Sequence, residues 1–580
     1  MCGIAGVFNP KYKVTKPELK SMTDSLIHRG PDGEGHWINS TGCVGFGHRR
    51  LSILDLSQLG HQPMSIQEGR YTITFNGEIY NYIELRKQLT DNGISFHSRS
   101  DTEVLLWLYA EYGEKCLNML DGMFAFAIWD EETKQLFIAR DRFGEKPLFY
   151  AIYRDSLYFG SEMKALWAAG VPRQIVEERL TDYILSGRIQ EGVDTHFSGI
   201  KRLLHSHFAL VDSELNVKPR QYWSLDNIEV NQTITFERAV SKYQELFFKS
   251  VERRLRSDVT VGSSLSGGVD SSSVVCVIDF LKKKRYRQNV FSARFSNFAK
   301  DEGVFIEIVK RHCQNVDAFE IYPNEIGLDT FLEKIVHHQE EPFGSSSISA
   351  QWLVMGLAKE HDTTVLLDGQ GADEFLAGYL PCYDAYLSQL FYTDPNKYNL
   401  EYAAYIARFS GDAKIQSMYE KETLRMKLGR YKKNMFRQQI KHEGLKDYLK
   451  KMLFGGSLQQ LLRYADRNSM AHSREVRLPF LSHELIEFVF SLPDEFLLQN
   501  GWTKYVHRKA LEPFLPKEIA WRVDKIGFEP PQKKWLENEA IQVIIEAQAQ
   551  KLGINRLDKK IISYTNDLDW RLLISSYYKI

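Results

Sequence analysis

The sequence predicts two domains, an N-terminal α+β domain of two packed sheets and a C-terminal α/β domain with a parallel sheet. The length of 580 residues exceeds what one hydrophobic core normally supports. The first third alternates short strand-like runs with turns, which is typical of packed sheets. Farther on, residues 259–278 and 365–379 each read as strand, glycine turn and helix. That repeat predicts parallel βαβ units, which bind ligands at the carboxyl ends of their strands.

Composition excludes several classes of protein. Hydrophobic content of 43% and charged content of 26% are ordinary for a globular protein. A net charge of −1 gives no general attraction to nucleic acid or to anionic membranes, so we expect neither as a partner. The six cysteines are scattered without a C-x-x-C pair, which indicates reduced thiols and no zinc site. No signal peptide or membrane-spanning run is evident, so we expect a cytoplasmic protein.

The chain begins with a cysteine after the initiator methionine. If Met1 is removed, Cys2 has both a thiol and a free α-amine. An amine with a pKa near ~8 is a usable base at neutral pH, and such pairs perform acyl transfer. A buried structural cysteine in an edge strand is the competing interpretation. Cys2 alone does not decide between them.

Four segments downstream of Cys2 favour the catalytic interpretation. Residues 28–33 form a polar glycine-proline loop, and residues 47–53 place Arg50 beside a short apolar strand. Residues 75–81 read as a strand running into an Asn-Gly turn, and residues 100–103 as a helix cap. Each segment alone has a purely structural explanation. In this order they resemble the class II, or N-terminal nucleophile, glutamine amidotransferases.

That resemblance implies an αββα sandwich of the Ntn-hydrolase type over residues 2–205, followed by a connector over residues 206–235. It also implies that Cys2 attacks the glutamine side-chain amide, with Asn76 and Gly77 as oxyanion donors. Arg50 would hold the α-carboxylate and Asp101 the α-ammonium of glutamine. The implied glutamine-binding residues are Arg50, Leu51, Ser52, Ile53, Asn76, Gly77, Glu78 and Asp101.

The strand, glycine turn and helix around residues 266–271 aim backbone N–H groups at an anion. Gly267 and Gly268 allow close approach, while Asp270 suits phosphate only if a hard cation such as Mg²⁺ lies between them. A turn that merely reverses the chain is the competing interpretation. The loop lacks the lysine of a Walker motif. It resembles the PP-loop of ATP pyrophosphatases, which transfer AMP and release pyrophosphate.

The second strand-turn-helix unit adds Asp373, which we expect to join Asp270 in binding Mg²⁺. Leu265 and Ala293 lie at predicted strand ends and are candidate adenine contacts, with plain core packing as the alternative for Ala293. The predicted metal ligands are Asp270 and Asp373. The predicted ATP-binding residues are Leu265, Ser266, Gly267, Gly268, Asp270, Ser271, Ala293, Asp368 and Gly369.

With residues 461–470 and 475–481, the chain resembles glutamine-hydrolysing asparagine synthetases along nearly its whole length. The resemblance implies an adenine nucleotide alpha hydrolase-like domain with added helices over residues 236–580. It also implies glutamine, aspartate and ATP as substrates, Mg²⁺ as cofactor, an aspartyl-AMP intermediate and a possible homodimer. Lys525, in a basic loop resembling the one those enzymes use on pyrophosphate, is expected to stabilise the leaving group. Ammonia would pass between the two sites along an enclosed path.

One position departs from that family. Gln370 stands where the best-known members have a catalytic glutamate, and an amide cannot accept a proton. Either another carboxylate, for which Glu341 is our candidate, supplies that function, or the acceptor is a sugar acid or peptide carboxylate. Residues 381–455 are also long for the family. A non-catalytic relative is disfavoured because the site residues are present. A tRNA-modifying PP-loop enzyme is disfavoured because no basic face is evident.

Overall fold

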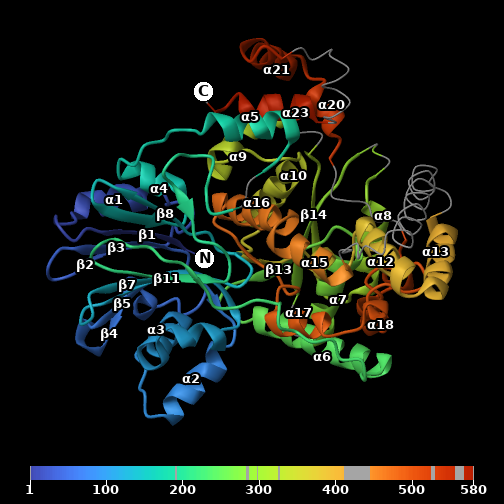
Figure 1. The fold of residues 1–580 in the computed structure, drawn as a ribbon, viewed down its shortest axis with the longest axis horizontal. Coiled ribbons are helices and arrows are strands. Elements are labelled where there is room, and N and C mark those ends of the chain that lie inside the picture. Colours follow the sequence, from blue (N-terminus) through green and yellow to red (C-terminus); the bar gives the residue numbers. More distant parts are fainter. Residues whose placement is uncertain are drawn as a thin grey trace, which may run out of the picture.

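The computed structural model describes residues 2–189, 192–282, 287–296, 298, 300–323, 327–409, 444–523, 530–554 and 567–578. In these ranges the N-terminal half contains two antiparallel sheets and the C-terminal half contains one parallel sheet (Figure 1). The predicted two-domain fold class is therefore confirmed. No helix in the described ranges has the length and apolar character needed to cross a bilayer.

The first sheet places the N-terminal strand in its interior. Its strand order is β10-β8-β9-β1-β3-β2. Strand β1 pairs with β3 on one side and β9 on the other, so Cys2 is held directly beside a fully buried strand. The strands are β1 (Gly3–Phe8), β2 (Gly33–Ile38), β3 (Val44–Arg50), β8 (Phe149–Tyr153), β9 (Ser156–Gly160) and β10 (Lys201–Arg202).

The second sheet packs against the first through a shared apolar core. Its order is β12-β11-β7-β6-β5-β4. Phe46 of the first sheet and Trp129 of the second belong to the same buried cluster. Strands β11 and β12 extend this sheet into the range predicted as a connector. The strands are β4 (Met64–Ile66), β5 (Tyr71–Ile79), β6 (Gly122–Asp130), β7 (Gln135–Arg140), β11 (His207–Val211) and β12 (Arg220–Gln221).

Helices cover both outer faces of the sheet pair, which gives the αββα layering. Helix α1 packs on β1 and β3, and α3 packs on β5. The helices of this half are α1 (Lys16–Asp24), α2 (Tyr82–Asp91), α3 (Asp101–Tyr112), α4 (Met163–Ala168) and α5 (Glu177–Ser186). Short 3₁₀ helices occur at Gln58–Gly60, Gln67–Gly69, Gly113–Met119, Leu328–Thr330 and Asp494–Phe496.

The C-terminal half is built on a five-stranded parallel sheet of order β15-β14-β13-β16-β17. The chain runs outward from β13 to β14 and β15, then returns to the other side of β13 through β16. The boundary between β13 and β16 is therefore a topological switch point, where such sheets bind ligands. The strands are β13 (Val261–Ser264), β14 (Gln288–Ala293), β15 (Val316–Ile321), β16 (Val365–Leu367) and β17 (Glu475–Arg477).

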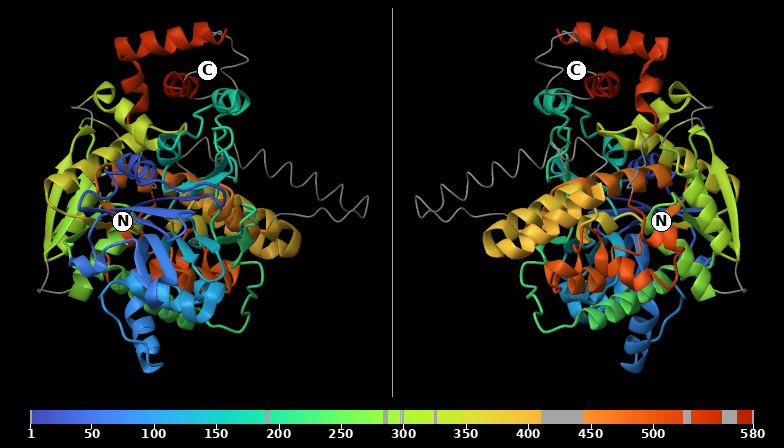
Figure 2. Two further views of the ribbon diagram at one scale, coloured as in Figure 1. Left: turned by 90° about the vertical axis from the view of Figure 1, so that its left-hand side faces the viewer. Right: turned by 90° about the vertical axis from the view of Figure 1, so that its right-hand side faces the viewer.

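Helices surround this sheet (Figures 1 and 2). Three of them, α12, α13 and α15, come from the region 381–455, whose residues 410–443 lie outside the described ranges. The helices are α6 (Phe236–Arg254), α7 (Val269–Lys282), α8 (Gly303–His312), α9 (Leu332–Gln339), α10 (Ser347–Glu360), α11 (Ala372–Phe375), α12 (Leu380–Thr393), α13 (Pro395–Phe409), α15 (Leu445–Phe454), α16 (Ser457–Ala471), α17 (His483–Phe490), α18 (Tyr505–Leu511), α19 (Lys517–Ala520), α20 (Gln532–Leu536), α21 (Glu539–Lys551) and α23 (Leu568–Ser575).

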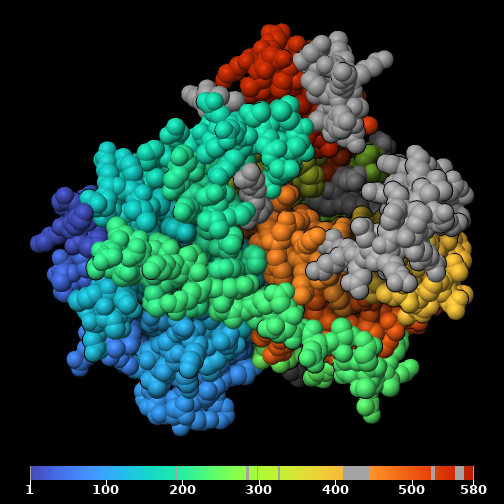
Figure 3. All heavy atoms as spheres, viewed as in Figure 1, coloured from blue at the N-terminus to red at the C-terminus, as the bar shows by residue number. Residues whose placement is uncertain are grey.

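The two halves meet along a broad interface, which the space-filling view shows on one face of the molecule (Figure 3). Helix α16 lies at its centre, where Asp466 pairs with Arg29 and Arg467 pairs with Glu162 of the N-terminal half. Near the C-terminus, α23 packs on α5, and Trp570 and Tyr183 both donate hydrogen bonds to the carbonyl oxygen of Phe343. The interface thus uses residues from widely separated parts of the chain.

Candidate active sites

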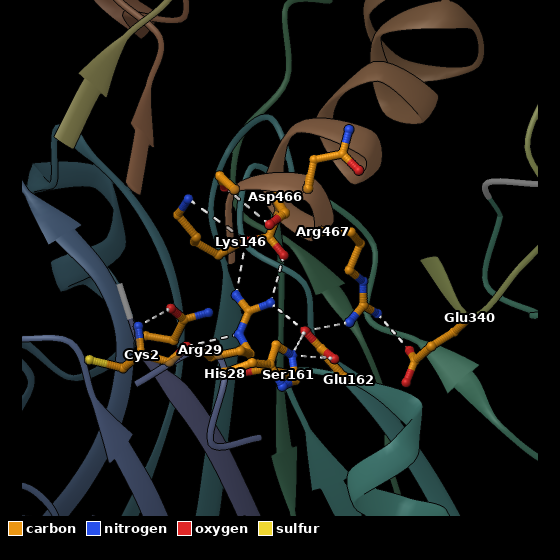
Figure 4. A network of polar contacts seen from close by, with 12 residues as sticks. Cys2, His28, Arg29, Lys146, Ser161, Glu162, Glu340, Asp466 and Arg467 are labelled. Carbon is orange, nitrogen blue, oxygen red and sulfur yellow. Dashed lines mark hydrogen bonds and ion pairs between the residues drawn. The ribbon is translucent and has the colours of Figure 1, made fainter. Parts of the chain in front are cut away.

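Cys2 is buried and held by two polar contacts from outside its own strand. Its backbone nitrogen lies 3.0 Å from Asn76 Oδ1, and Arg29 Nε donates to its carbonyl oxygen at 3.0 Å (Figure 4). Its Sγ lies 4.0 Å from the carbonyl oxygen of Leu51. Burial raises the pKa of the thiol. A nearby base is therefore needed to generate the thiolate at neutral pH.

Asn76 and Gly77 lie inside β5, paired with β6, so the predicted Asn-Gly turn is wrong. Gly77 is required by close packing, because a Cβ there would meet Met123 O at 2.1 Å. Within the described ranges, the Nδ2 group of Asn76 is buried without a hydrogen-bond acceptor. A buried, unpaired amide beside a thiol is the arrangement expected of an oxyanion donor.

Of the other predicted glutamine-binding residues, Leu51 contacts Cys2 directly, whereas Arg50 contacts the loop that follows it. The guanidinium of Arg50 donates to the carbonyl oxygen of Ser57 at 2.9 Å and also to that of Asp55, so it supports the adjoining loop. Leu51, Ser52 and Ile53 continue directly from it, and Leu51 provides the backbone contact to Cys2 Sγ.

Asp101 and Glu78 are buried carboxylates near the same site. Asp101 begins α3 and accepts the N–H of Ile79 at 2.8 Å, while the side chain of Ser100 caps the helix as predicted. Burial raises the pKa of Asp101 to about 6. Burial also raises the pKa of Glu78, which lies 3.6 Å from Arg477 of the other half. The site around Cys2 is therefore bordered by a residue of the C-terminal half.

Beyond the carboxyl ends of β13 and β14 lies a mainly apolar cavity of about 280 Å³. Both candidate adenine contacts, Leu265 and Ala293, line it. A second cavity of about 340 Å³ adjoins it and shares Ser266, Asp368 and Gln370 as lining residues. It is called the polar cavity because charged side chains such as Asp373 and Lys504 line it. The pair fits a nucleotide whose base occupies the apolar part and whose phosphates occupy the polar part.

Two glycines of these loops are required by geometry. Gly267 has φ +79°, and a Cβ there would lie 2.8 Å from the Cβ of Phe305. A Cβ at Gly369 would lie 2.6 Å from the backbone nitrogen of Ser271. Close approach of the two loops therefore brings Asp368 and Gly369 against residues 266–271. The remaining loop residues, Gly268 and Asp270, line the polar cavity.

The ammonium group of Lys504 lies between the carboxylates of Asp270 and Asp373. Its Nζ lies 2.6 Å from both carboxylates. Burial would lower the pKa of Lys504, but the two carboxylates raise it, so the side chain stays charged. Lys504 was not among the predicted site residues. The missing lysine in the PP-loop is the one signal that a cation must come from elsewhere in the chain.

The expectation for Glu341 is wrong. Its carboxylate is buried in the domain interface, where it accepts from Arg202 at 2.7 Å and from the backbone of His196 at 2.9 Å, and it lines neither cavity. Glu374 lines the polar cavity instead, with a hydrogen bond from Tyr379 at 2.7 Å. Gln370 lines both cavities. Lys525 lies outside the described residues.

Helix α16 connects the two sites. Its Leu461 and Tyr464 line the apolar cavity. Two residues farther on, Asp466 accepts hydrogen bonds from both terminal nitrogens of Arg29, at 2.8 and 2.9 Å, and Arg29 Nε donates to the carbonyl oxygen of Cys2 (Figure 4). A single helix thus contacts the nucleotide-sized cavity and the residue that positions the thiol.

The two halves of the chain each match a known protein family. Residues 1–223 match the glutamine amidotransferase domain family, and residues 242–567 match the asparagine synthase family. The chain is 33% identical to glutamine-hydrolyzing asparagine synthetase 1 of Bacillus subtilis (strain 168), over 93% of this chain and 88% of that protein. It is 32% identical to synthetase 3 of that organism, over 90% and 86%. Amidase chry2 of Gibberella zeae is 27% identical, over 95% and 93%. The chain therefore belongs to the family of glutamine-hydrolysing asparagine synthetases.

Proposed function

We propose that this protein uses glutamine and ATP to convert aspartate to asparagine, with release of glutamate, AMP and pyrophosphate. The observation that carries the proposal is the pair of sites in one chain. A buried thiol lies beside the amide of Asn76, whose Nδ2 has no hydrogen-bond partner among the described residues, and a nucleotide-sized cavity lies in the C-terminal half. The activity named for the relatives requires both sites.

At the first site, removal of Met1 gives Cys2 a free α-amine that takes the proton of the thiol. The thiolate attacks the side-chain carbonyl carbon of glutamine, and Asn76 and Gly77 donate hydrogen bonds to the developing oxyanion. The amine returns the proton to the departing nitrogen, which leaves as ammonia. Water then hydrolyses the thioester to glutamate. Arg50 and Asp101 hold the α-carboxylate and α-ammonium of glutamine, helped by Glu78 and the backbone of residues 51–53.

At the second site, the adenine of ATP lies in the apolar cavity beside Leu265 and Ala293. Its phosphates face the PP-loop, residues 266–271, and Gly369. The aspartate side-chain carboxylate attacks the α-phosphorus, and pyrophosphate leaves. Ammonia then attacks the acyl carbon of the aspartyl adenylate, and AMP leaves. Lys504 neutralises developing phosphate charge, and we assign the same role to Lys525.

Magnesium fits this site. Asp270 and Asp373 supply hard carboxylate oxygens that already converge around one positive charge, and phosphate oxygens and water can complete the preferred oxygen coordination. When bound, Mg²⁺ would offset the negative charge of the phosphates.

The division of the chain follows from these roles. We assign glutamine hydrolysis to residues 2–205, a linking role to residues 206–235 and acceptor activation to residues 236–580. We also propose a cytoplasmic location, where ATP and free amino acids are both present, and a homodimer by analogy with the family.

A coupled assay tests the proposal. With glutamine, ATP, Mg²⁺ and aspartate, we expect asparagine, AMP and pyrophosphate in equal amounts. If AMP is released with a uronic acid or a peptide carboxylate but not with aspartate, the acceptor is that other carboxylate and not aspartate. Gln370→Glu refines the result, because a large gain with aspartate would show that the amide limits activity with that substrate.

A further inference from the structure

Arg477 lies where the C-terminal half meets the site around Cys2, and the mechanism above does not use it. It ends β17, the edge strand of the parallel sheet, and its side chain is fully buried. Its carbonyl oxygen accepts the N–H of Asp368 at 3.0 Å, so the sheet also fixes its backbone. A buried charge is costly unless it is paired, so the partners of this guanidinium indicate what the residue does.

Three hydrogen bonds fix the position of the guanidinium. Its Nε donates to Glu475 Oε1 at 2.6 Å, and its Nη1 donates to the carbonyl oxygens of Arg254 and Arg256 at 2.8 and 2.6 Å. Because a guanidinium is planar and rigid, these contacts also determine where Nη2 lies. Nη2 has no hydrogen-bond partner among the described residues, and it lies 3.6 Å from Glu78 Oε2.

Glu78 belongs to the site around Cys2. It lies on the same side of β5 as Asn76, because side chains two residues apart in a strand share a face. Asn76 contacts the backbone nitrogen of Cys2, so Glu78 borders the cysteine. The charge of Asp101, to which we assign the α-ammonium of glutamine, also acts on Glu78. Two buried carboxylates in one site suit a cationic group of the substrate.

Arg477 also favours the charged form of Glu78. Burial raises the pKa of Glu78, and the charges of Glu475 and Asp101 raise it further, whereas the charge of Arg477 lowers it. A neutral carboxyl group would lose the Coulomb attraction to an ammonium group. The same contact therefore supports both the position and the charge of this side chain.

We propose that Arg477 is a positioning residue for glutamine recognition, which holds the Glu78 carboxylate against the α-ammonium of the substrate. This inference rests on the proposed function. The C-terminal half thereby contributes to substrate selection in the N-terminal half. The effect is specific to the α-amino group, because Arg50 holds the α-carboxylate and Cys2 attacks the amide.

The test compares glutamine with 4-carbamoylbutanoate, which has the same amide and carboxylate but no α-ammonium. The measurement is kcat/KM for ammonia release from each compound without ATP, expressed as the ratio of glutamine to the analogue. We expect Arg477→Met to lower this ratio about tenfold, the factor expected when one charge-assisted contact with the substrate weakens. A general structural defect would lower both kcat/KM values and leave their ratio unchanged.

Two further variants calibrate the result. Arg477→Lys keeps the positive charge but loses the fixed fork of donors, so it should lower the ratio by a smaller factor. Arg202→Lys is the matched control, since Arg202 is another buried arginine of the interface and pairs with Glu341. It should leave the ratio unchanged.

The effect must act through Glu78. Glu78→Gln should lower the ratio by itself, and adding Arg477→Lys should then change it no further. A parent-like ratio in Arg477→Met or in Glu78→Gln would overturn the inference, as would a further fall in the double variant. If Arg477→Met fails to fold, Arg477→Lys decides, and a parent-like ratio there overturns the inference. A parent that releases no ammonia from glutamine contradicts the proposed function itself. A parent and variants with equal discrimination contradict only the role of Arg477.

Discussion

At the scale of single residues, the chemistry depends on groups whose surroundings change their ordinary behaviour. Among the described residues, the Nδ2 group of Asn76 has no acceptor beside Cys2, and burial raises the pKa of Asp101 to about 6. Lys504 adopts a left-handed backbone conformation, φ 54°, and places its ammonium between two carboxylates. Such a conformation is unfavourable for a residue other than glycine, so the surrounding structure must stabilise it.

Removing the thiol should separate the two activities. We expect Cys2→Ala to abolish asparagine formation from glutamine while synthesis from ammonium continues at the parent rate, because only the first site needs a nucleophile. Cys43→Ala is the matched control, since Cys43 is half-buried away from either site and should leave both rates unchanged. Product analysis by amino-acid chromatography measures both. Continued glutamine use by Cys2→Ala would contradict the assignment.

The raised pKa of Asp101 predicts a pH dependence. The carboxylate must be ionised to hold the α-ammonium of glutamine, so glutaminase kcat/KM should fall as the pH drops below about 6. The rate of asparagine synthesis from ammonium should not show this fall in acid, because that reaction does not use Asp101. A pH profile of each activity is the measurement. The prediction fails if glutaminase kcat/KM stays level down to pH 5.

Lys504 should affect only the ATP-dependent half reaction. We expect Lys504→Met to reduce pyrophosphate release about 10²- to 10³-fold, the usual cost of losing one group that stabilises transition-state charge, and to leave glutamine hydrolysis intact. Lys504→Arg keeps the positive charge, so its rate of pyrophosphate release should fall less than that of Lys504→Met. Pyrophosphate and glutamate assays on one preparation provide the comparison. Equal losses in both assays would indicate a folding defect instead.

At the scale of elements, two connections unite the halves. Helix α16 reaches the nucleotide cavity with one turn and Arg29 with the next. The segment after α9 provides Glu340 and Glu341, and Glu340 accepts the backbone N–H groups of Met163 and Lys164 at the start of α4. These contacts place a carboxylate at a helix N-terminus, where the dipole favours it.

Glu341 should matter for stability rather than for chemistry. Burial alone would raise its pKa, but Arg202 and His196 lower it. Glu341→Gln leaves Arg202 buried with a neutral partner, and breaking such a pair costs about 3–5 kcal/mol. We therefore expect a clearly lower thermal midpoint. Glu132→Gln, which removes a pair with a 66% exposed carboxylate, should cost about 0–1 kcal/mol.

The ion pair between Glu341 and Arg202 also makes the free energy of unfolding depend on pH in the acid range. Because the folded pKa of Glu341 lies below the unfolded value, its contribution is present above pH about 4 and is lost as the pH falls toward the folded pKa. The stability difference between the parent and Glu341→Gln should therefore narrow in acid. A constant difference from pH 7 to pH 3 would contradict this role for the carboxylate.

At the scale of the whole molecule, the site around Cys2 lies at the interface between the two halves. Residues of the synthetase half, Arg477 and Asp466, contact groups that belong to the glutaminase site. The C-terminal helix α23 packs back on α5, so the end of the chain also helps to fix the halves (Figure 1). An internal transfer of ammonia requires such a fixed geometry, because a mobile interface would admit water and allow ammonia to leave.

Isotope labelling tests that transfer. With glutamine carrying ¹⁵N in its amide and an excess of unlabelled ammonium in solution, we expect asparagine to retain most of the label, because nitrogen released inside the protein does not mix with the solvent. Mass spectrometry of the asparagine measures the retained fraction. Label diluted to the isotopic composition of the solution would show that ammonia leaves the protein before it reacts.

Local sequence alone was sufficient for several features. The β-branched strand, the glycine turn and the helix around residues 266–271 determine the PP-loop, because their backbone preferences are short-range. The order of segments after Cys2 was enough to predict the fold of the first half. The prediction of an Asn-Gly turn is wrong because pairing with β6 keeps Asn76 and Gly77 in a strand. Cross-strand pairing therefore outweighed a local turn preference.

Tertiary structure decided which charged groups meet. Sequence could not place Lys504 between Asp270 and Asp373, because 131 residues separate it from the nearer of the two in the chain. It could not show that Glu341 is used in the interface between the halves. Burial and pairing of charges are long-range properties, set by which elements pack together. The sequence by itself determined the two chemistries, and only the packing of the halves decided how they are joined.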